Sequence, residues 1–305
     1  MQKLPVLITF FNRPAILEQL FVAISKRNDI QIFFACDGPR NEIDKSKIEA
    51  CWILVEKYFG KVPPNRKLER SSNLGCKNAM KQNIDWFFDR NEFGLILEDD
   101  CIPNHDFFKY LGYALLEFES SKNIICLAGT DFVPDEFNSS TGLFRESIFP
   151  MVWGWGTWAK KWSFYQLEIH DHKEVVSLAA DRLFGPKSSI IKTYFENSFN
   201  MRFREVNIGV IDTWDYSLLA STWRNNFKSL QLNANLVVNS GFTTEATHTT
   251  LTPPHWVPTE YQLPRSESGV LSQYDPGPDV WLTTNVYNCT FVDLLKNQVK
   301  KVIRK

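Results

Sequence analysis

An apolar run at residues 93–97 stops at three consecutive acids, Glu98, Asp99 and Asp100, and Pro103 follows shortly after. A short, wholly apolar run is typical of a strand buried on both faces of a sheet. Three adjacent acids repel one another unless a cation or hydrogen-bond donors take up their charge. The stretch therefore predicts a strand that delivers acids to a sheet edge, where Mn²⁺ or Mg²⁺ would find oxygen ligands.

A second interpretation of these acids is a helix start. Asp100 or Asn104 would then cap a helix that begins at His105, and the other acids would be solvated. The buried strand directly before the acids favours the site.

The first 131 residues alternate apolar runs with stretches of helical spacing. The runs at 6–10, 30–36 and 124–128 each end at a polar turn, and a shorter strand is expected near 68–70. Apolar residues three and four positions apart predict the helices between them. Strands that alternate with helices predict an α/β fold with a mostly parallel sheet, whose ligands bind beyond the carboxyl ends of the strands.

After residue 132 the alternation is less regular. Residues 150–158 predict an aromatic and glycine-rich loop that enters a helix. A helical pattern follows Asp215, and a further strand is expected at 236–238. We expect this half to be a less regular layer on the same sheet.

The amino-acid composition limits the classes of binding partner that we expect. The 34 Lys and Arg nearly balance the 35 Asp and Glu, for a net charge of -1, so no overall field favours nucleic acid. The six cysteines form no CxxC pair and no metal spacing, which is typical of reduced thiols in a cytosolic protein.

The two ends of the given sequence also bear on where in the cell we expect the protein. The apolar start lacks a small-residue cleavage site, and no stretch approaches the ~18 to 20 apolar residues of a membrane span. Residues 286–305 form a basic amphipathic tail, either a solvated helix or a contact with anionic lipid or a partner. We expect a cytoplasmic protein, with peripheral contact at the inner face of the membrane as the tail's second interpretation.

Residues 73–78 contain an Asn-x-Gly turn before a predicted helix. Gly75 lets the backbone approach a ligand, while the helix N-terminus and Lys77 favour an anionic phosphate. Without a ligand, Asn73 and Gly75 would form a simple turn.

The acid motif also carries a family resemblance. Leu97-Glu98-Asp99-Asp100, with Pro103, Asp106-Phe107-Phe108 and Tyr110 after it, resembles the metal-binding motif and following helix of the GT-A glycosyltransferases, above all the N-acetylglucosaminyltransferase I family. Shorter motifs follow in the family's order: Asn12-Arg13-Pro14, Asp37-Gly38, Leu143-Phe144-Arg145, Phe149-Pro150 and Trp153-Gly154-Trp155. The resemblance covers roughly residues 4–250.

The resemblance implies a GT-A fold, a Rossmann-like sheet flanked by helices. Residues 1–131 would be the nucleotide-sugar binding half, 132–285 the acceptor-side half of the same composite domain, and 286–305 the tail.

It also implies roles for single residues. Asp100 would be the metal ligand, Asp99 would lie near the ribose or the metal, and Asp37 would accept from the uracil N–H. Arg13 would lie near the nucleotide, and His248 would face the diphosphate or the metal. The other residues implied to contact the nucleotide sugar are Thr9, Phe10, Asn73, Gly75, Lys77, Glu98, Trp153, Gly154 and Trp155.

Some of these residues have plainer interpretations. Asp37 could simply form a turn with Gly38 and Pro39, and Arg13 and His248 could be surface residues. Trp153 and Trp155 could belong to the core, to an interface or to a sugar platform.

Transfer of a sugar with inversion needs a carboxylate that takes the proton of the acceptor hydroxyl. The candidates are Asp212 and Asp215, and we favour Asp215. The family shows adjacent acids before a tryptophan, and this chain departs from that pattern. In the other interpretation Asp212 is a helix cap and Asp215 an exposed helix acid.

These predictions describe a metal-dependent glycosyltransferase of surface polysaccharide biosynthesis. It would move a sugar from a UDP-sugar, with N-acetylglucosamine favoured by the resemblance, to a glycan or lipid-linked acceptor with inversion. The alternatives are a sugar nucleotidyltransferase, although no early glycine-rich phosphate loop is present, and a non-catalytic glycan-binding protein.

Overall fold

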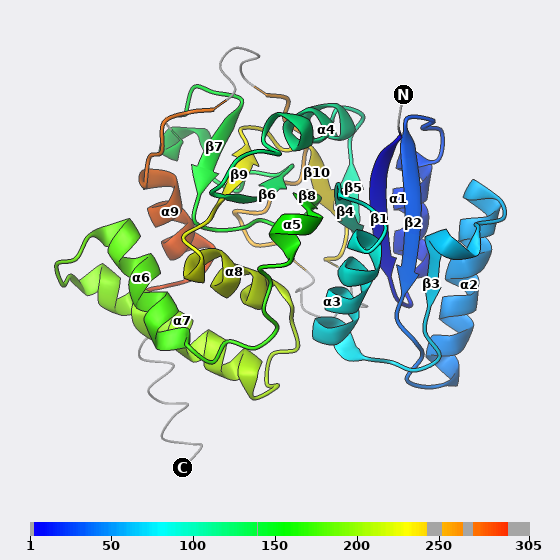
Figure 1. Ribbon diagram of the computed structural model, residues 1–305, viewed down its shortest axis with the longest axis horizontal. Helices are drawn as coiled ribbons and strands as arrows, with labels where there is room; N and C mark the ends of the chain where they lie inside the picture. The colour runs from blue at the N-terminus through cyan, green and yellow to red at the C-terminus, as the bar shows by residue number, and fades with distance from the viewer. Residues whose placement is uncertain (1–2, 139, 243–251, 265–270, 292–305) are drawn as a thin grey trace.

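The computed structural model describes residues 3–138, 140–242, 252–264 and 271–291. Its centre is an eight-stranded sheet of order β3-β2-β1-β4-β8-β6-β9-β7 (Figure 1). From one edge to the other the strands are β3 Lys67–Glu69, β2 Ile30–Cys36, β1 Leu4–Phe10, β4 Phe93–Glu98, β8 Trp155–Trp158, β6 Ile124–Ala128, β9 Lys228–Leu232 and β7 Phe144–Ser147.

The sheet is mixed but mostly parallel. Parallel pairs join β3 to β2, β2 to β1, β1 to β4, and β6 to β9. Strand β8 runs antiparallel to both β4 and β6, and β7 runs antiparallel to β9. The predicted α/β class with a mostly parallel, helix-flanked sheet is confirmed.

Helices cover both faces of the sheet. The α-helices are α1 Pro14–Ile24, α2 Glu42–Phe59, α3 Gly75–Phe88, α4 Phe107–Glu117, α5 Ala159–Trp162, α6 His172–Phe184, α7 Ile190–Asn207, α8 Asp215–Arg224 and α9 Gly277–Asn285, with 3₁₀ turns η1 Pro64–Arg66 and η2 Asp135–Phe137. One core cluster joins Val6 and Ile8 to α1, α2 and α4, and another joins Leu7 to α3 and α5. Strand β1 is apolar at every position except Thr9, because its two faces pack against different helices.

The C-terminal half forms a third core cluster. Helices α6, α7 and α8 pack together with the inward side of α9, at the left of Figure 1. Strand β8 comes from this half of the chain but lies between β4 and β6. The halves predicted at 1–131 and 132–285 therefore share one sheet.

The prediction of a loop over residues 150–158 is wrong for its second part, because Trp155–Trp158 is strand β8. Glycine is depleted in strands, which favours a loop when only the sequence is considered. Here Gly156 is needed for close packing, since a Cβ on it would lie 2.7 Å from Leu95 Cδ2. Trp155 and Trp158 point to opposite faces and join different core clusters.

A second, two-stranded sheet pairs β5 Cys101–Pro103 with β10 Val237–Asn239. It holds the segment that directly follows the acids. All six cysteines are free thiols. In the part of the chain that the structure describes, no helix combines the length and apolar character needed to cross a membrane.

Candidate active site

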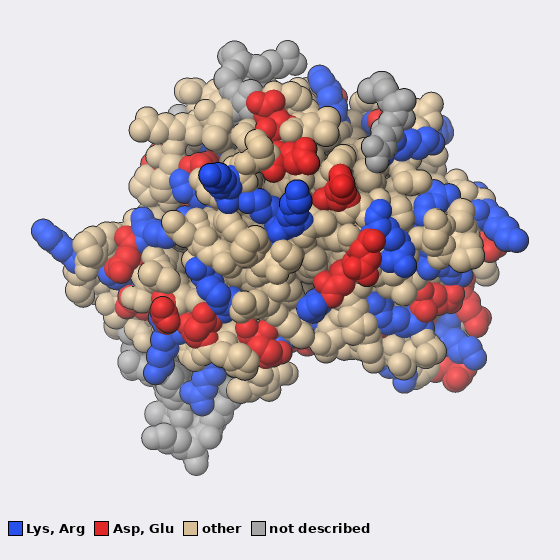
Figure 2. Space-filling model, in the orientation of Figure 1, with Lys and Arg blue, Asp and Glu red and all other residues tan. Residues whose placement is uncertain are grey.

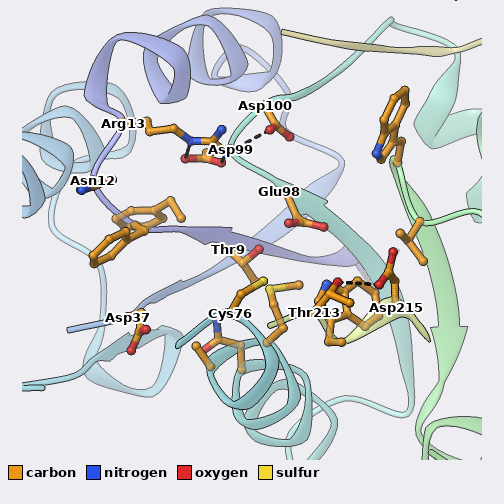
Figure 3. Close-up of a pocket in the computed structure, with 18 of the residues that line it drawn as sticks. Thr9, Asn12, Arg13, Asp37, Cys76, Glu98, Asp99, Asp100, Thr213 and Asp215 are labelled. Atoms are coloured by element: carbon orange, nitrogen blue, oxygen red, sulfur yellow. Dashed lines mark hydrogen bonds and ion pairs between the residues drawn. The ribbon is translucent and has the colours of Figure 1, made fainter. Parts of the chain in front are cut away.

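A cavity of about 540 Å³ opens at the carboxyl ends of β1, β2 and β4. The first turns of α3, residues 152–153 and the turn before α8 complete its walls (Figure 3). The predicted site residues that line it are Thr9, Phe10, Arg13, Asp37, Glu98, Asp99, Asp100, Trp153 and Asp215. The structure thus brings together side chains from strands that are far apart in sequence.

Arg13 reaches from the end of β1 to the acids that follow the neighbouring strand β4. Its Nε donates to Asp99 Oδ2 at 3.1 Å, and its Nη2 donates to Asp99 Oδ1 and, at 3.0 Å, to Asp100 Oδ2. Burial lowers the Arg13 pKa, but the two carboxylates and their hydrogen bonds outweigh it and raise the pKa above its ordinary value. The side chain is 16% exposed, so the surface-charge interpretation is wrong.

Glu98 is the acid of this group that forms no ion pair with another described residue. Within the described residues its carboxyl has no hydrogen-bond donor. Burial, and then the charges of Asp100 and Asp99, raise the Glu98 pKa to about 8. Burial also raises the Asp99 pKa to about 6, against the opposing charge of Arg13. One guanidinium therefore leaves repulsion within the cluster that a further cation would relieve.

Asp100 lies where the second sheet meets the cavity. Its carbonyl accepts the Ser240 N–H at 2.8 Å, and Asn239 Nδ2 approaches its Oδ1 at 3.4 Å. Gly241 packs so closely that a Cβ on it would lie 2.3 Å from Asp100 Oδ2. Asp100 does not cap α4, because Asn104 Oδ1 accepts the first N–H groups of that turn.

The contacts of Asp100 are compatible with a divalent cation at this point of the cavity. Among the described residues no three His, Cys, Asp or Glu side chains converge on one point. Asp100 borders the cavity, and its Oδ1 has only long contacts, to Asn239 and to the Cys101 thiol at 3.6 Å. This arrangement fits Mg²⁺ or Mn²⁺ held by one carboxylate and completed by phosphate oxygens and water.

Asp37 lies at the end of β2 and is held by the turn before α3. Gly38 N and Leu74 N donate to Oδ1, and Asn73 Nδ2 donates to Oδ2 at 2.9 Å. Burial raises the Asp37 pKa, and these backbone N–H groups oppose the rise. Asn73 does not line the cavity, and its amide instead orients Asp37.

The N-terminus of α3 already holds an anionic group of the chain. Asp212 Oδ2 accepts Cys76 N–H at 2.8 Å, and its Oδ1 accepts Lys77 N–H at 3.0 Å. Lys77 is buried and donates to Glu168 at 3.1 Å. The structure therefore places Gly75, Lys77 and Asp212 outside the cavity lining, with Asp212 where the sequence predicted a phosphate. Gly75 is needed at this turn, because its φ is +77°.

Asp215 is the first residue of α8 and faces the cavity. Its Oδ1 accepts from Thr213 Oγ1 at 2.5 Å and from Tyr216 N at 2.8 Å. Figure 3 shows Asp215 across the cavity from Arg13 and Asp99, with Glu98 between them. The buried Trp214 stacks on Trp155 at 5.4 Å and fixes the turn that presents Asp215.

The structure separates the predicted aromatic residues. Trp153 lines the cavity and stacks on Trp256, with ring centroids 6.3 Å apart. Trp155 has no exposed surface and belongs to the core. Gly154 has a φ of +64°, and a Cβ on it would lie 2.5 Å from Val237, so close packing requires glycine there.

Sequence reasoning missed Arg40 and Phe11, which line the cavity together with Asp37 and Asn12. Arg40 lies 4.9 Å from the Phe11 ring centroid and is held by Asp44, whose carboxylate also accepts Asn12 Nδ2 at 2.6 Å. The signal was present, because Arg40 follows the predicted strand-end turn. The other lining residues that were missed are Lys47, Cys76, Ala79, Met80, Asn83, Val152, Thr213, Trp214 and Asn239.

The predicted metal ligand His248 and the tail from residue 292 lie outside the described residues. On the face shown in Figure 2, Lys and Arg are interspersed with Asp and Glu, as the balanced composition predicts. Comparisons of the chain with protein-family models and with curated proteins gave no match.

Proposed function

We propose that the chain is a GT-A glycosyltransferase that uses a divalent metal to move a sugar from a UDP-sugar to a glycan or lipid-linked acceptor. One observation carries the proposal. A cluster of acids after β4 and a separate carboxylate, Asp215, face the same cavity from different walls. Such a cavity separates the groups that hold a leaving diphosphate from a base that activates a hydroxyl.

Asp37 supports recognition of the nucleotide base. Three donors surround this carboxylate, from Gly38, Asn73 and Leu74, and the Leu74 N–H is shared between its two oxygens. The carboxylate also borders the cavity, where it would accept an imide N–H such as that of uracil in place of one half of the shared Leu74 contact. Arg40 and Phe11 also line the cavity and contact each other, and together they would form a platform for the base.

Asp100 would hold the Mn²⁺ or Mg²⁺. When bound, the cation supplies charge stabilisation to the leaving diphosphate. Arg13 holds Asp99 and Asp100 in place and keeps positive charge beside them.

Asp215 is the proposed general base. Thr213 and the backbone N–H of Tyr216 both donate to Oδ1, which leaves Oδ2 without a described partner and able to accept a proton. Asp212 has both oxygens engaged by backbone N–H groups. A base on this wall takes the proton of a hydroxyl that attacks from the side opposite the leaving group, which gives inversion.

The test measures release of UDP from a panel of UDP-sugars with Mn²⁺, UDP-N-acetylglucosamine included. We expect UDP release by the wild type, and a loss of Mn²⁺-dependent UDP binding in Asp100→Ala, measured by calorimetry. Unchanged binding in that variant would contradict the metal assignment. Release of pyrophosphate from a nucleoside triphosphate and a sugar phosphate would instead identify a nucleotidyltransferase.

The base is tested by a matched pair of variants. Asp215→Asn is expected to lower kcat by about 10²- to 10⁴-fold while UDP binding is retained. Asp212→Asn, which keeps an acceptor at the α3 N-terminus, is expected to retain most activity. The assignment fails if Asp212→Asn loses the activity and Asp215→Asn keeps it.

A further inference from the structure

A second concave surface, which we call the α9 groove, lies between η2 and α9. It has a volume of about 510 Å³ and is lined by Glu136, Phe137, His255, Trp281 and Asn285, among others. Phe137 is 50% exposed, and its ring lies 6.1 Å from that of Trp281 at an interplanar angle of 32°. Two aromatic faces thus meet in an open groove.

Polar side chains surround these rings. Asn285 is one helical turn after Trp281, and its Nδ2 donates to the Trp281 carbonyl, which leaves Oδ1 without a described partner. Within the described residues the Glu136 carboxylate and the His255 ring also have no hydrogen-bond partner. Flat aromatic faces beside unpaired acceptors and donors match a sugar ring, which has C–H faces and a belt of hydroxyls.

The groove has a rigid base. The buried Asp279 of α9 accepts from Ser147 Oγ and from Ile148 N at 2.9 Å, and Arg145 Nη1 lies 3.6 Å from it. These contacts tie α9 to β7 and its following residues. Trp281 and Asn285 are therefore presented on a helix that is anchored to the main sheet.

Aromatic contacts connect the α9 groove to the catalytic cavity. Trp153 lines the cavity and stacks on Trp256, and the residue before Trp256, His255, lines the groove. Phe132 packs on both tryptophans, at 4.9 Å from Trp153 and 5.2 Å from Trp256, and it lies two residues before Pro134 of the groove. The same two segments thus contribute to both surfaces.

We infer that the α9 groove binds a saccharide unit of the acceptor glycan, at a distance from the unit that receives the new sugar. This inference rests on the proposed function, since an acceptor glycan is meaningful only for a glycosyltransferase. It specifies that function further: the acceptor would be an oligosaccharide long enough to contact Trp153 and the groove together.

The first experiment applies the full chain to a microarray of oligosaccharides of one to eight sugar units. We expect binding to at least one oligosaccharide and weaker binding to its shorter fragments. Phe137→Ala should lower the affinity for that oligosaccharide by about tenfold or more, the loss typical of an aromatic anchor. Asn285→Ala should also lower it, and far-UV circular dichroism verifies that both variants fold.

Phe164→Ala is the matched control. Phe164 is 42% exposed and packs on Phe227, with ring centroids 5.0 Å apart, but it lies outside the groove. Its substitution should leave saccharide binding unchanged. A wild type that binds no oligosaccharide, or equal affinities in Phe137→Ala and Phe164→Ala, would overturn the inference.

UDP release from the donor with water as acceptor separates this inference from the proposed function. Phe137→Ala should release UDP at the wild-type rate, because Phe137 lines the groove and does not line the donor cavity. Loss of saccharide binding in Phe137→Ala supports the groove even if no donor is hydrolysed, in which case the proposed function alone fails. A dimer that Phe137→Ala converts to a monomer would assign the groove to a second copy of the chain and overturn the saccharide assignment.

Discussion

Replacing Arg13 with methionine should destabilise the protein strongly. Methionine keeps most of the apolar stem but removes the guanidinium from Asp99 and Asp100. The Asp99 side chain is only 5% exposed and accepts two hydrogen bonds from Arg13. Without them, a buried carboxylate is left beside two other acids.

The expected magnitude follows from this burial. Removing one partner of a buried ion pair costs about 3 to 5 kcal/mol, because the other charge stays desolvated and unpaired. With an m-value of about 3 kcal/mol per M in urea, the midpoint of unfolding should fall by at least about 1 M.

Arg27→Met is the matched control. Arg27 also makes a two-pronged pair, with Asp29, but that carboxylate is 56% exposed. Exposed pairs contribute about 0 to 1 kcal/mol, so the control should lose much less stability. Both variants are compared by urea unfolding, followed by circular dichroism and tryptophan fluorescence at pH 7.

Equal losses of stability in the two variants would refute this prediction. If Arg13→Met and Arg27→Met lower the free energy of unfolding by the same amount, the burial of Asp99 does not determine the strength of its pairing.

Two further predictions concern the supports of the site. Gly75→Ala should cost about 1 kcal/mol more than Gly60→Ala in urea unfolding, because both have positive φ but only a Cβ at 75 would meet Asp212, at 2.7 Å; equal costs would show that this contact is harmless. Asp44→Asn should reduce the loss of unfolding free energy that the protein shows as the pH falls into the acid range. The Arg40 hydrogen bonds lower the Asp44 pKa from 3.8 to about 2, so the stabilisation is present above pH 3.8 and is lost as the pH falls toward 2. The measurement is thermal unfolding at several pH values. If wild type and variant lose stability equally as the pH falls, Asp44 does not cause the acid sensitivity.

The sequence alone determined the N-terminal half of the fold and the place of the acids. Apolar runs that end in polar turns define strands locally, and the parallel order then brings Arg13, Asp37 and Asp99 to one sheet edge. Each of these steps depends on short-range patterns that are visible along the chain.

Only the tertiary structure decided which candidates share the cavity. Asp212 and Asp215 are three residues apart and chemically equal, yet one caps α3 and the other faces the cavity. Trp153 lines the cavity, whereas Trp155 belongs to a strand between β4 and β6. Those outcomes depend on contacts between segments more than 50 residues apart, such as the pairing of Trp155 with Ile96, which no local pattern records.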